Sequence, residues 1–129
     1  MILAVLDASA VLALLLEEPG AERVRAVLAQ CALTVVNFSE VVGHFARNGT
    51  EERDIRLVLD PLPLNLVNFD KDLAFAAGLL VPATRRAGLS FGDRACLALA
   101  SRLGVRALTA DRSWRNIAQT IGVEIDLIR

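Results

Sequence analysis

Four of the chain's 15 acidic residues lie at the ends of apolar or helical patterns instead of on polar helix faces. Asp7 and Asp111 each follow a short apolar run. Glu40 lies just past another apolar run, in the first turn of the helix expected there, and Asp93 begins the longest helical pattern. Carboxylates in such positions serve either as helix caps or as ligands of a cation, and each of the four taken alone fits a cap.

The chemistry follows if the four side chains meet. Two carboxylates about 5 Å apart repel by roughly 3 kcal/mol at an effective dielectric constant of about 20, so four of them would take up protons or bind a cation. Oxygen-only ligands favour a hard ion such as Mg²⁺ or Mn²⁺. A metal ion in an acidic pocket supports phosphodiester hydrolysis, since it activates a water and stabilises charge on the phosphate.

The elements expected along the chain place the four acids on one edge of a sheet. Strands are expected at Met1–Leu6, Leu33–Val36, Leu64–Val67, Val105–Thr109 and Val123–Leu127. Helices are expected after Asp7, over Ala21–Gln30, from Asn37 to about Asn48, from Thr50 to Leu59, from Asn68 to about Leu80, from Phe91 to Leu103 and from Ser113 to Ile121, with Pro82–Ser90 as a polar connection. This alternation predicts one α/β domain over residues 1–129, with a mostly parallel sheet covered by helices on both faces. In such a sheet, strand carboxyl ends and the following helix N-termini share the edge that holds ligands.

Composition narrows the class of protein. The net charge of −1 argues against a protein that coats nucleic acid non-specifically, though not against an enzyme that cleaves it. The 54% hydrophobic content favours self-association, and Cys31 and Cys96 are expected to be buried reduced thiols. Met1–Leu6 has no basic flank and Asp7 interrupts it, so we expect no signal peptide, no membrane span and a cytoplasmic location.

Four segments resemble the motifs of PIN-domain ribonucleases, in particular the VapC-type toxins of VapBC toxin–antitoxin systems. They are Leu6–Ala10 (LDASA), Asn37–Val41 (NFSEV), Leu89–Ala98 (LSFGDRACLA) and Leu108–Trp114 (LTADRSW). The similarity is ordered and extends from Ile2 to Ile128. Short acidic motifs are individually weak, but four in this order and spacing are fairly specific.

The resemblance implies a PIN-like α/β/α domain, an acidic pocket for Mg²⁺ or Mn²⁺, RNA endonuclease activity, and a homodimer neutralised by a cognate antitoxin. By position, Asp7 and Asp93 correspond to the central metal ligands, and Glu40 and Asp111 complete the catalytic set. Ser9 resembles a hydroxyl that supports the pocket. Asn116 stands where some relatives have another polar or acidic residue, and this difference would weaken a second metal site.

Several further residues have two interpretations. Arg94 and Arg112 directly follow two of the acids, and they would contact RNA phosphates or pair with a neighbouring carboxylate. Trp114 could stack on a base, but packing of the last helix is the interpretation we favour. His44 lies four residues after Glu40 and is interpreted as a packing or hydrogen-bonding residue.

Other functions are less well supported. A catalytically silent PIN-like binding scaffold is the main alternative, although it would have no reason to keep four acids. A phosphoacceptor receiver domain would need a late lysine, and Lys71 is the only lysine. An Asp-x-Asp phosphohydrolase is disfavoured because Ser9 stands two residues after Asp7. There is no GxxxxGK[ST] or GxGxxG motif for nucleotide binding.

Overall fold

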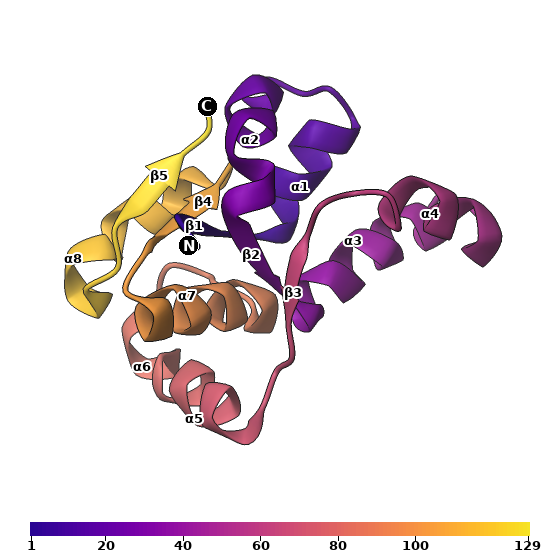
Figure 1. Cartoon of the computed structure of the whole chain (residues 1–129). Helices are drawn as coiled ribbons and strands as arrows, with labels where there is room; N and C mark the ends of the chain where they lie inside the picture. Colours follow the sequence, from indigo (N-terminus) through magenta and orange to yellow (C-terminus); the bar gives the residue numbers. More distant parts are fainter.

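Five parallel strands form the centre of the fold in the computed structural model, which describes all 129 residues (Figure 1). The strands are β1 (Ala4–Leu6), β2 (Cys31–Thr34), β3 (Asn65–Val67), β4 (Arg106–Thr109) and β5 (Ile125–Leu127). Their order in the sheet is β3-β2-β1-β4-β5, and every neighbouring pair is parallel. The order reverses beside β1, which is the place where parallel α/β sheets open a crevice at the strand carboxyl ends.

Helices link the strands and cover both faces of the sheet (Figure 1). They are α1 (Ala8–Leu15), α2 (Ala21–Val27), η1 (Leu28–Gln30), α3 (Val35–Arg47), α4 (Glu52–Leu59), α5 (Lys71–Leu79), α6 (Val81–Thr84), α7 (Phe91–Leu103), η2 (Arg112–Asn116) and α8 (Ala118–Ile121). The predicted α/β/α class is therefore confirmed. None of these helices combines the length and the apolar character that a membrane span requires.

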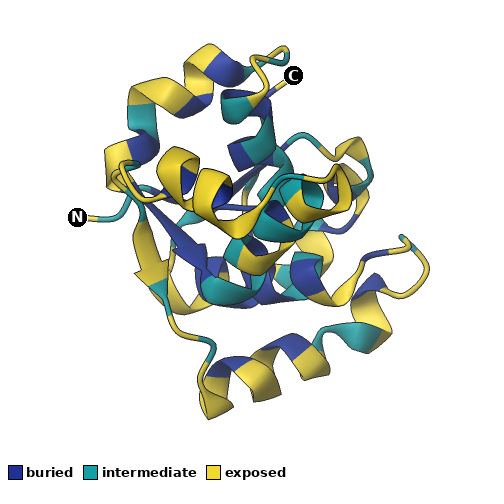
Figure 2. Cartoon of the chain, turned by 90° about the vertical axis from the view of Figure 1, so that its right-hand side faces the viewer, coloured by how far each residue is buried: buried dark blue, intermediate teal, exposed yellow.

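The alternation of side chains along β1 divides the core in two. Ala4 and Leu6 point into a cluster formed with α1 to α4, whereas Val5 points into a second cluster formed with α5, α7 and η2. All three residues are fully buried, so β1 reads as a continuous apolar run, as expected for a strand covered on both faces. Figure 2 shows the consequence: buried strands lie inside, whereas an edge strand and the outer sides of the helices carry exposed residues.

Two sequence expectations about packing are confirmed. Cys31 and Cys96 are both buried and free. Trp114 is fully buried in the second cluster, where its indole Nε1 has no hydrogen-bond partner. The Glu17–Gly20 segment separates α1 from α2, with Gly20 at a φ of 96°, a left-handed conformation that suits glycine.

Element boundaries differ from the expectation at several ends: the strands expected from Met1 and Val123 begin at Ala4 and Ile125, and the helix expected over Ala21–Gln30 divides into α2 and η1. The second strand ends at Thr34, two residues early, because the Thr34 side chain accepts from the backbone N–H of Asn37 and starts α3 at once. The expected polar connection Pro82–Ser90 begins inside the short helix α6. The expected helix Ser113–Ile121 is divided into η2 and α8.

Candidate active site

Asp7 lies at the carboxyl end of β1 and is 4% exposed. It is the N-cap of α1, since its Oδ1 accepts from the backbone N–H of Ala10 at 2.9 Å. Two hydroxyls also donate to the carboxylate: Ser9 Oγ to Oδ1 at 2.7 Å and Thr109 Oγ1 to Oδ2 at 2.6 Å. Burial raises the pKa of Asp7 to about 6, with a smaller contribution from the negative charge of Asp93, although these hydrogen bonds oppose the rise.

Ser9 and Thr109 connect the first acid to the strand that carries the last one. Ser9 Oγ accepts from the backbone N–H of Ala110 at 2.9 Å, and Thr109 Oγ1 accepts from the backbone N–H of Asp111 at 3.0 Å. Thr109 is fully buried at the end of β4, next to β1. The two hydroxyls therefore fix the carboxyl ends of β1 and β4 relative to each other around Asp7.

Glu40 lies in the second turn of α3, not in its first turn as the sequence predicted, because the helix begins at Val35. Its Oε1 accepts from Asn37 Nδ2 at 2.8 Å. The carboxylate lies against Gly92, where an added Cβ would overlap both of its oxygens. Partial desolvation raises the pKa of Glu40, and the charge of Asp93 adds to this effect, while the Asn37 hydrogen bond opposes it.

Asp93 is the third residue of α7 and completes a capping box. Its Oδ2 accepts from the backbone N–H of Ser90 at 2.8 Å, and Ser90 Oγ accepts from the backbone N–H of Asp93 at 3.2 Å. Burial raises the pKa of Asp93, and the negative charge of Asp111 adds to the rise, whereas the Ser90 hydrogen bonds and the Arg94 charge oppose it.

Asp111 follows β4 by two residues and is the N-cap of η2. Its Oδ1 accepts both from the backbone N–H of Ser113 at 2.9 Å and from Ser113 Oγ at 2.7 Å. Asp7, Asp93 and Asp111 thus all act as helix caps, which the sequence offered as the alternative to cation ligands. Capping is compatible with a shared position at one edge of the sheet.

Asp93 stands at the centre of the acidic group. Its charge raises the pKa of both Asp7 and Glu40, and its own pKa is raised by Asp111. The pKa of the buried Cys96 thiol is raised well above its usual value, first by burial and then by the charges of Asp7, Asp93 and Glu40. The structure therefore brings the four acids into one electrostatic neighbourhood.

The four acids are not closed into a ligand cage. No group of three or more acidic, histidine or cysteine side chains is arranged to hold a metal ion as it stands. One oxygen nevertheless remains without a protein hydrogen bond in each of Glu40, Asp93 and Asp111. The candidate ligand atoms are all carboxylate oxygens, which repel one another. Their type and their charge match a hard divalent cation.

The other residues singled out in the sequence make fewer contacts. Arg94 donates to the carbonyl of Leu89 at 2.9 Å, and neither Arg94 nor Arg112 forms an ion pair. Asn116 is exposed in η2 and makes no side-chain hydrogen bond. His44 lies 3.4 Å from Asn48 through its Nε2 and packs edge-on against Phe45, so its expected packing role is confirmed.

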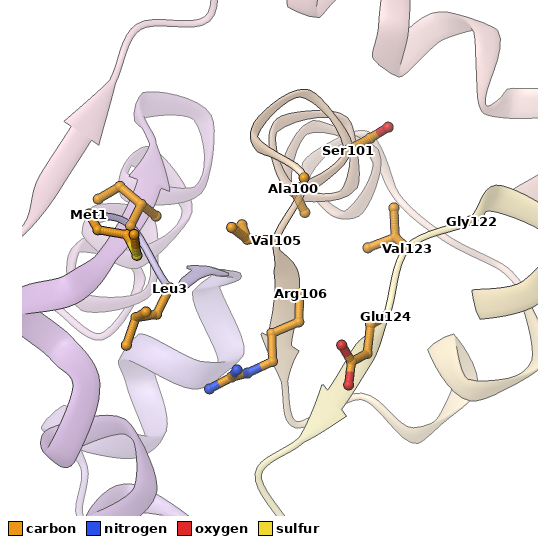
Figure 3. Close-up of a pocket in the computed structure, with 11 residues that line it drawn as sticks. Met1, Leu3, Ala100, Ser101, Val105, Arg106, Gly122, Val123 and Glu124 are labelled. Atoms are coloured by element: carbon orange, nitrogen blue, oxygen red, sulfur yellow. The ribbon is translucent and has the colours of Figure 1, made fainter.

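A hollow of about 490 Å³ lies at the opposite, amino-terminal edge of the sheet (Figure 3). Met1 and Leu3 line one side and Val123 and Glu124 another, and none of the four acids takes part. Arg106, which also lines it, already pairs with Asp126 at 3.2 Å. This hollow is therefore separate from the acidic edge.

Three residues of the site were missed in the sequence: Asn37, Gly92 and Thr109. Each lies inside one of the four motifs, so its closeness to an acid in the sequence was the one feature that could have marked it as a site residue. Their contacts between different elements join residues that are 52 to 102 positions apart, and no local pattern reports such contacts.

The sequence matches the family described as PIN domain over residues 4–119. The chain belongs to the PIN domain family, and the resemblance of its four motifs to that family is confirmed. Comparison with curated protein sequences gave no match.

Solved structures share this fold over nearly the whole chain. The DNA-bound VapBC from Salmonella typhimurium has a TM-score of 0.77 and 17% identity and covers 100% of both chains. VapBC-1 from nontypeable Haemophilus influenzae has a TM-score of 0.71 and 16% identity, with 98% of each chain covered. VapBC-5 from Mycobacterium tuberculosis, a member of the VapBC family of toxin–antitoxin systems, has a TM-score of 0.64 and 20% identity, with 98% of this chain and 99% of that chain covered. At these identities the likeness establishes the fold.

Proposed function

We propose that this protein is a Mg²⁺- or Mn²⁺-dependent RNA endonuclease and the toxin of a toxin–antitoxin pair. PIN domains are generally nucleases, and this chain keeps an acid at all four motif positions. The observation that carries the proposal is the gathering of these acids around Asp93, three of them (Asp7, Glu40 and Asp93) being partly or fully desolvated. A protein gains stability from such a group only when a cation or protons neutralise it.

The residues that would hold the metal are Asp7, Glu40, Asp93 and Asp111. Mg²⁺ or Mn²⁺ bound there would supply an activated water and would stabilise negative charge on the scissile phosphate. Three donors hold the carboxylate of Asp7 in one orientation. Asp93 and Asp111 are held by their caps through one oxygen each, which directs the other oxygen away from the cap.

Arg112 and Arg94 are the candidates for binding the RNA backbone. Arg112 is exposed and free of ion pairs, so its guanidinium is available to a phosphate. Arg94 is half-buried and partly committed to the Leu89 carbonyl. We therefore expect Arg112→Ala to weaken RNA binding more than Arg94→Ala, which fluorescence anisotropy with a labelled RNA in Ca²⁺ would measure.

The test of the activity is Mg²⁺-dependent cleavage of RNA by the Asp7→Asn and Asp93→Asn variants. Both should lose at least about a hundredfold in rate, which corresponds to about 2.7 kcal/mol of transition-state stabilisation. Asp54→Asn is the matched control, since Asp54 is an exposed acid in the first turn of α4 and its side chain makes no hydrogen bond. Undiminished cleavage by both site variants, in folded protein, rejects the assignment.

Calorimetric titration with Mn²⁺ separates the enzyme from the silent scaffold. The enzyme should bind Mn²⁺, and Asp93→Asn should weaken the binding because Asp93 interacts with all three other acids. A scaffold would bind none.

For partners, we propose a cognate antitoxin that covers the acidic edge with a basic side chain. Several structures with this fold are toxin–antitoxin complexes, including one from Klebsiella pneumoniae with a TM-score of 0.72. The test is co-expression with any small protein encoded immediately upstream. A co-purified complex should show little RNA cleavage, and cleavage should return when the partner is removed.

We also propose that the chain forms a homodimer through apolar helix faces. Phe75 and Leu79 on α5 and Phe91 and Leu103 on α7 are exposed, and these two helices pack against each other. Leu79, 76% exposed, is the side chain to change. Leu79→Lys should convert a dimer to a monomer in light scattering, whereas Leu57→Lys, at an exposed position on α4, should leave the dimer intact.

A further inference from the structure

Asn37 is a buried amide between the two helices that carry Glu40 and Asp93. It is 1% exposed, although it lies in α3 only three residues before the exposed Glu40. Its Nδ2 donates to Glu40 Oε1 at 2.8 Å and to the backbone carbonyl of Gly92 at 2.9 Å. A single amide group therefore joins the carboxylate of one helix to the first turn of another.

The orientation of this amide is fixed by a third residue. Thr34 Oγ1 donates to Asn37 Oδ1 at 2.7 Å, and the same hydroxyl accepts from the backbone N–H of Asn37 at 3.0 Å. Because Oδ1 is engaged as an acceptor, Nδ2 must face Glu40 and Gly92. Both of its N–H groups are then used, and the buried amide has no unpaired donor left.

Gly92 provides the space that the Glu40 carboxylate occupies. A Cβ at this position would overlap both carboxylate oxygens, and its three nearest neighbours would all be atoms of the Glu40 carboxylate. Its φ is not positive, so the backbone itself does not require glycine here. The absence of a side chain at Gly92 instead leaves the space in which the Glu40 carboxylate lies. Gly92 stands immediately before Asp93 in α7.

We propose that Asn37 and Gly92 are positioning residues that hold the Glu40 carboxylate beside Asp93 as a ligand for a divalent cation. This inference rests on the proposed function. Neither residue binds the cation. Asn37 directs the carboxylate by donating to one oxygen, and Gly92 leaves room for it against α7. The other oxygen of Glu40 makes no protein hydrogen bond and remains for the cation.

A purely structural role makes a different prediction, because Asn37 also links α3 to α7 through the Gly92 carbonyl. In that case its removal would destabilise the fold and weaken cation binding whether or not Glu40 is present. The positioning role requires that the effect on cation binding disappear when Glu40 is removed.

The experiment is calorimetric titration of the full chain with Mn²⁺, with the thermal unfolding midpoint measured in EDTA. Gly92→Ala should weaken Mn²⁺ binding by about 10- to 100-fold, as changes to groups that orient ligands typically do. It should leave the unfolding midpoint unchanged or higher, because the clash is with the end of a flexible side chain and alanine favours the helix.

Asn37→Ala should also weaken Mn²⁺ binding in the otherwise wild-type chain, and it should cause no further loss in a Glu40→Ala background. Asn65→Ala is the matched control, because Asn65 Nδ2 likewise donates to two groups, the carbonyls of Ala29 and Cys31, but away from the acids. That variant should keep wild-type affinity for Mn²⁺.

Unchanged Mn²⁺ affinity in Gly92→Ala overturns the proposal, and so does an equal loss from Asn37→Ala with and without Glu40. In both cases the wild-type chain still binds Mn²⁺ and the proposed function stands. A wild-type chain that binds no Mn²⁺ overturns both.

Discussion

Replacing Asp7 by asparagine should stabilise the metal-free protein at neutral pH while removing its activity. The pKa of Asp7 in the folded protein is about 6, against an ordinary value of 3.8, mainly because the side chain is buried. The folded state therefore binds the proton more tightly than the unfolded state. The stability that this group contributes is fully present below about pH 3.8 and is lost as the pH rises through about 6.

The size of the effect follows from the two pKa values. Their difference corresponds to a loss of about 3 kcal/mol in the free energy of unfolding between about pH 4 and pH 7. Asparagine stays neutral and avoids this loss. The amide of asparagine would stand where a carboxylate oxygen of Asp7 accepts from the Thr109 hydroxyl. Rearranging that hydrogen bond costs about 1 kcal/mol. Asp7→Asn should thus be less stable than the wild type by about 1 kcal/mol at pH 4 and more stable by about 2 kcal/mol at pH 7.5.

The assay is urea unfolding of both proteins in EDTA at several pH values from 4 to 8. The difference in the free energy of unfolding between the two proteins reports on Asp7. Glu40 and Asp93, whose pKa values are also raised, are present in both. At pH 7.5 the thermal midpoint of Asp7→Asn should be higher by about 8 °C. Adding Mg²⁺ should raise the midpoint of the wild type and have much less effect on the variant. A difference that does not change with pH, or a variant that is less stable at pH 7.5, refutes the reasoning.

Three further predictions concern the fold. Burial raises the pKa of both the Cys31 and Cys96 thiols, so neither should react with a disulfide reagent at pH 8 until denaturant is added; rapid reaction of the native protein would contradict this. Gly20→Ala should lower the free energy of unfolding in urea by about 2 kcal/mol, because the residue has a φ of 96° and the new methyl group would lie 2.6 Å from the Ile128 carbonyl oxygen; a neutral effect would show that the turn relaxes. Trp114→Ala should cost about 3–5 kcal/mol in the same assay, since the indole is fully buried, and a loss below 1 kcal/mol would argue against that packing.

The sequence was sufficient to predict the sheet and the edge that carries the acids. Short apolar runs marked all five strands, and their helical connections required parallel pairing, which the strand order confirms. The capping positions of Asp7, Asp93 and Asp111 could also be predicted, because a cap depends only on residues within a few positions of it.

The start of α3 was predicted two residues late, for a physical reason. Val35 and Val36 are branched and apolar, and they fit a buried strand as well as a helix. The hydroxyl of Thr34 decides between the two by capping the helix, and this moves Glu40 into the second turn. Similarly, Asp111 binds Ser113 through two hydrogen bonds, so the chain tightens into η2 before α8 begins.

Apart from Ser9, which the family resemblance implied, the partners that hold the acids could not be predicted. Thr109 looks like an ordinary strand residue, and its contact with Asp7 exists only because β4 pairs with β1. The position of the Glu40 carboxylate depends on the packing of α3 against α7. Such contacts are properties of the packed structure, and a single sequence does not report them.

The place of β4 beside β1 has a consequence for how the protein is made. β1 ends at Leu6 and β4, its neighbour on one side, begins only at Arg106, so β1 leaves the ribosome well before β4 is made. Until then the Thr109 hydroxyl is missing from Asp7, and Asp111 does not yet exist. The acidic edge can therefore assemble only after β4 has been synthesised and has paired with β1, so the earliest and the latest of the four acids meet late in folding.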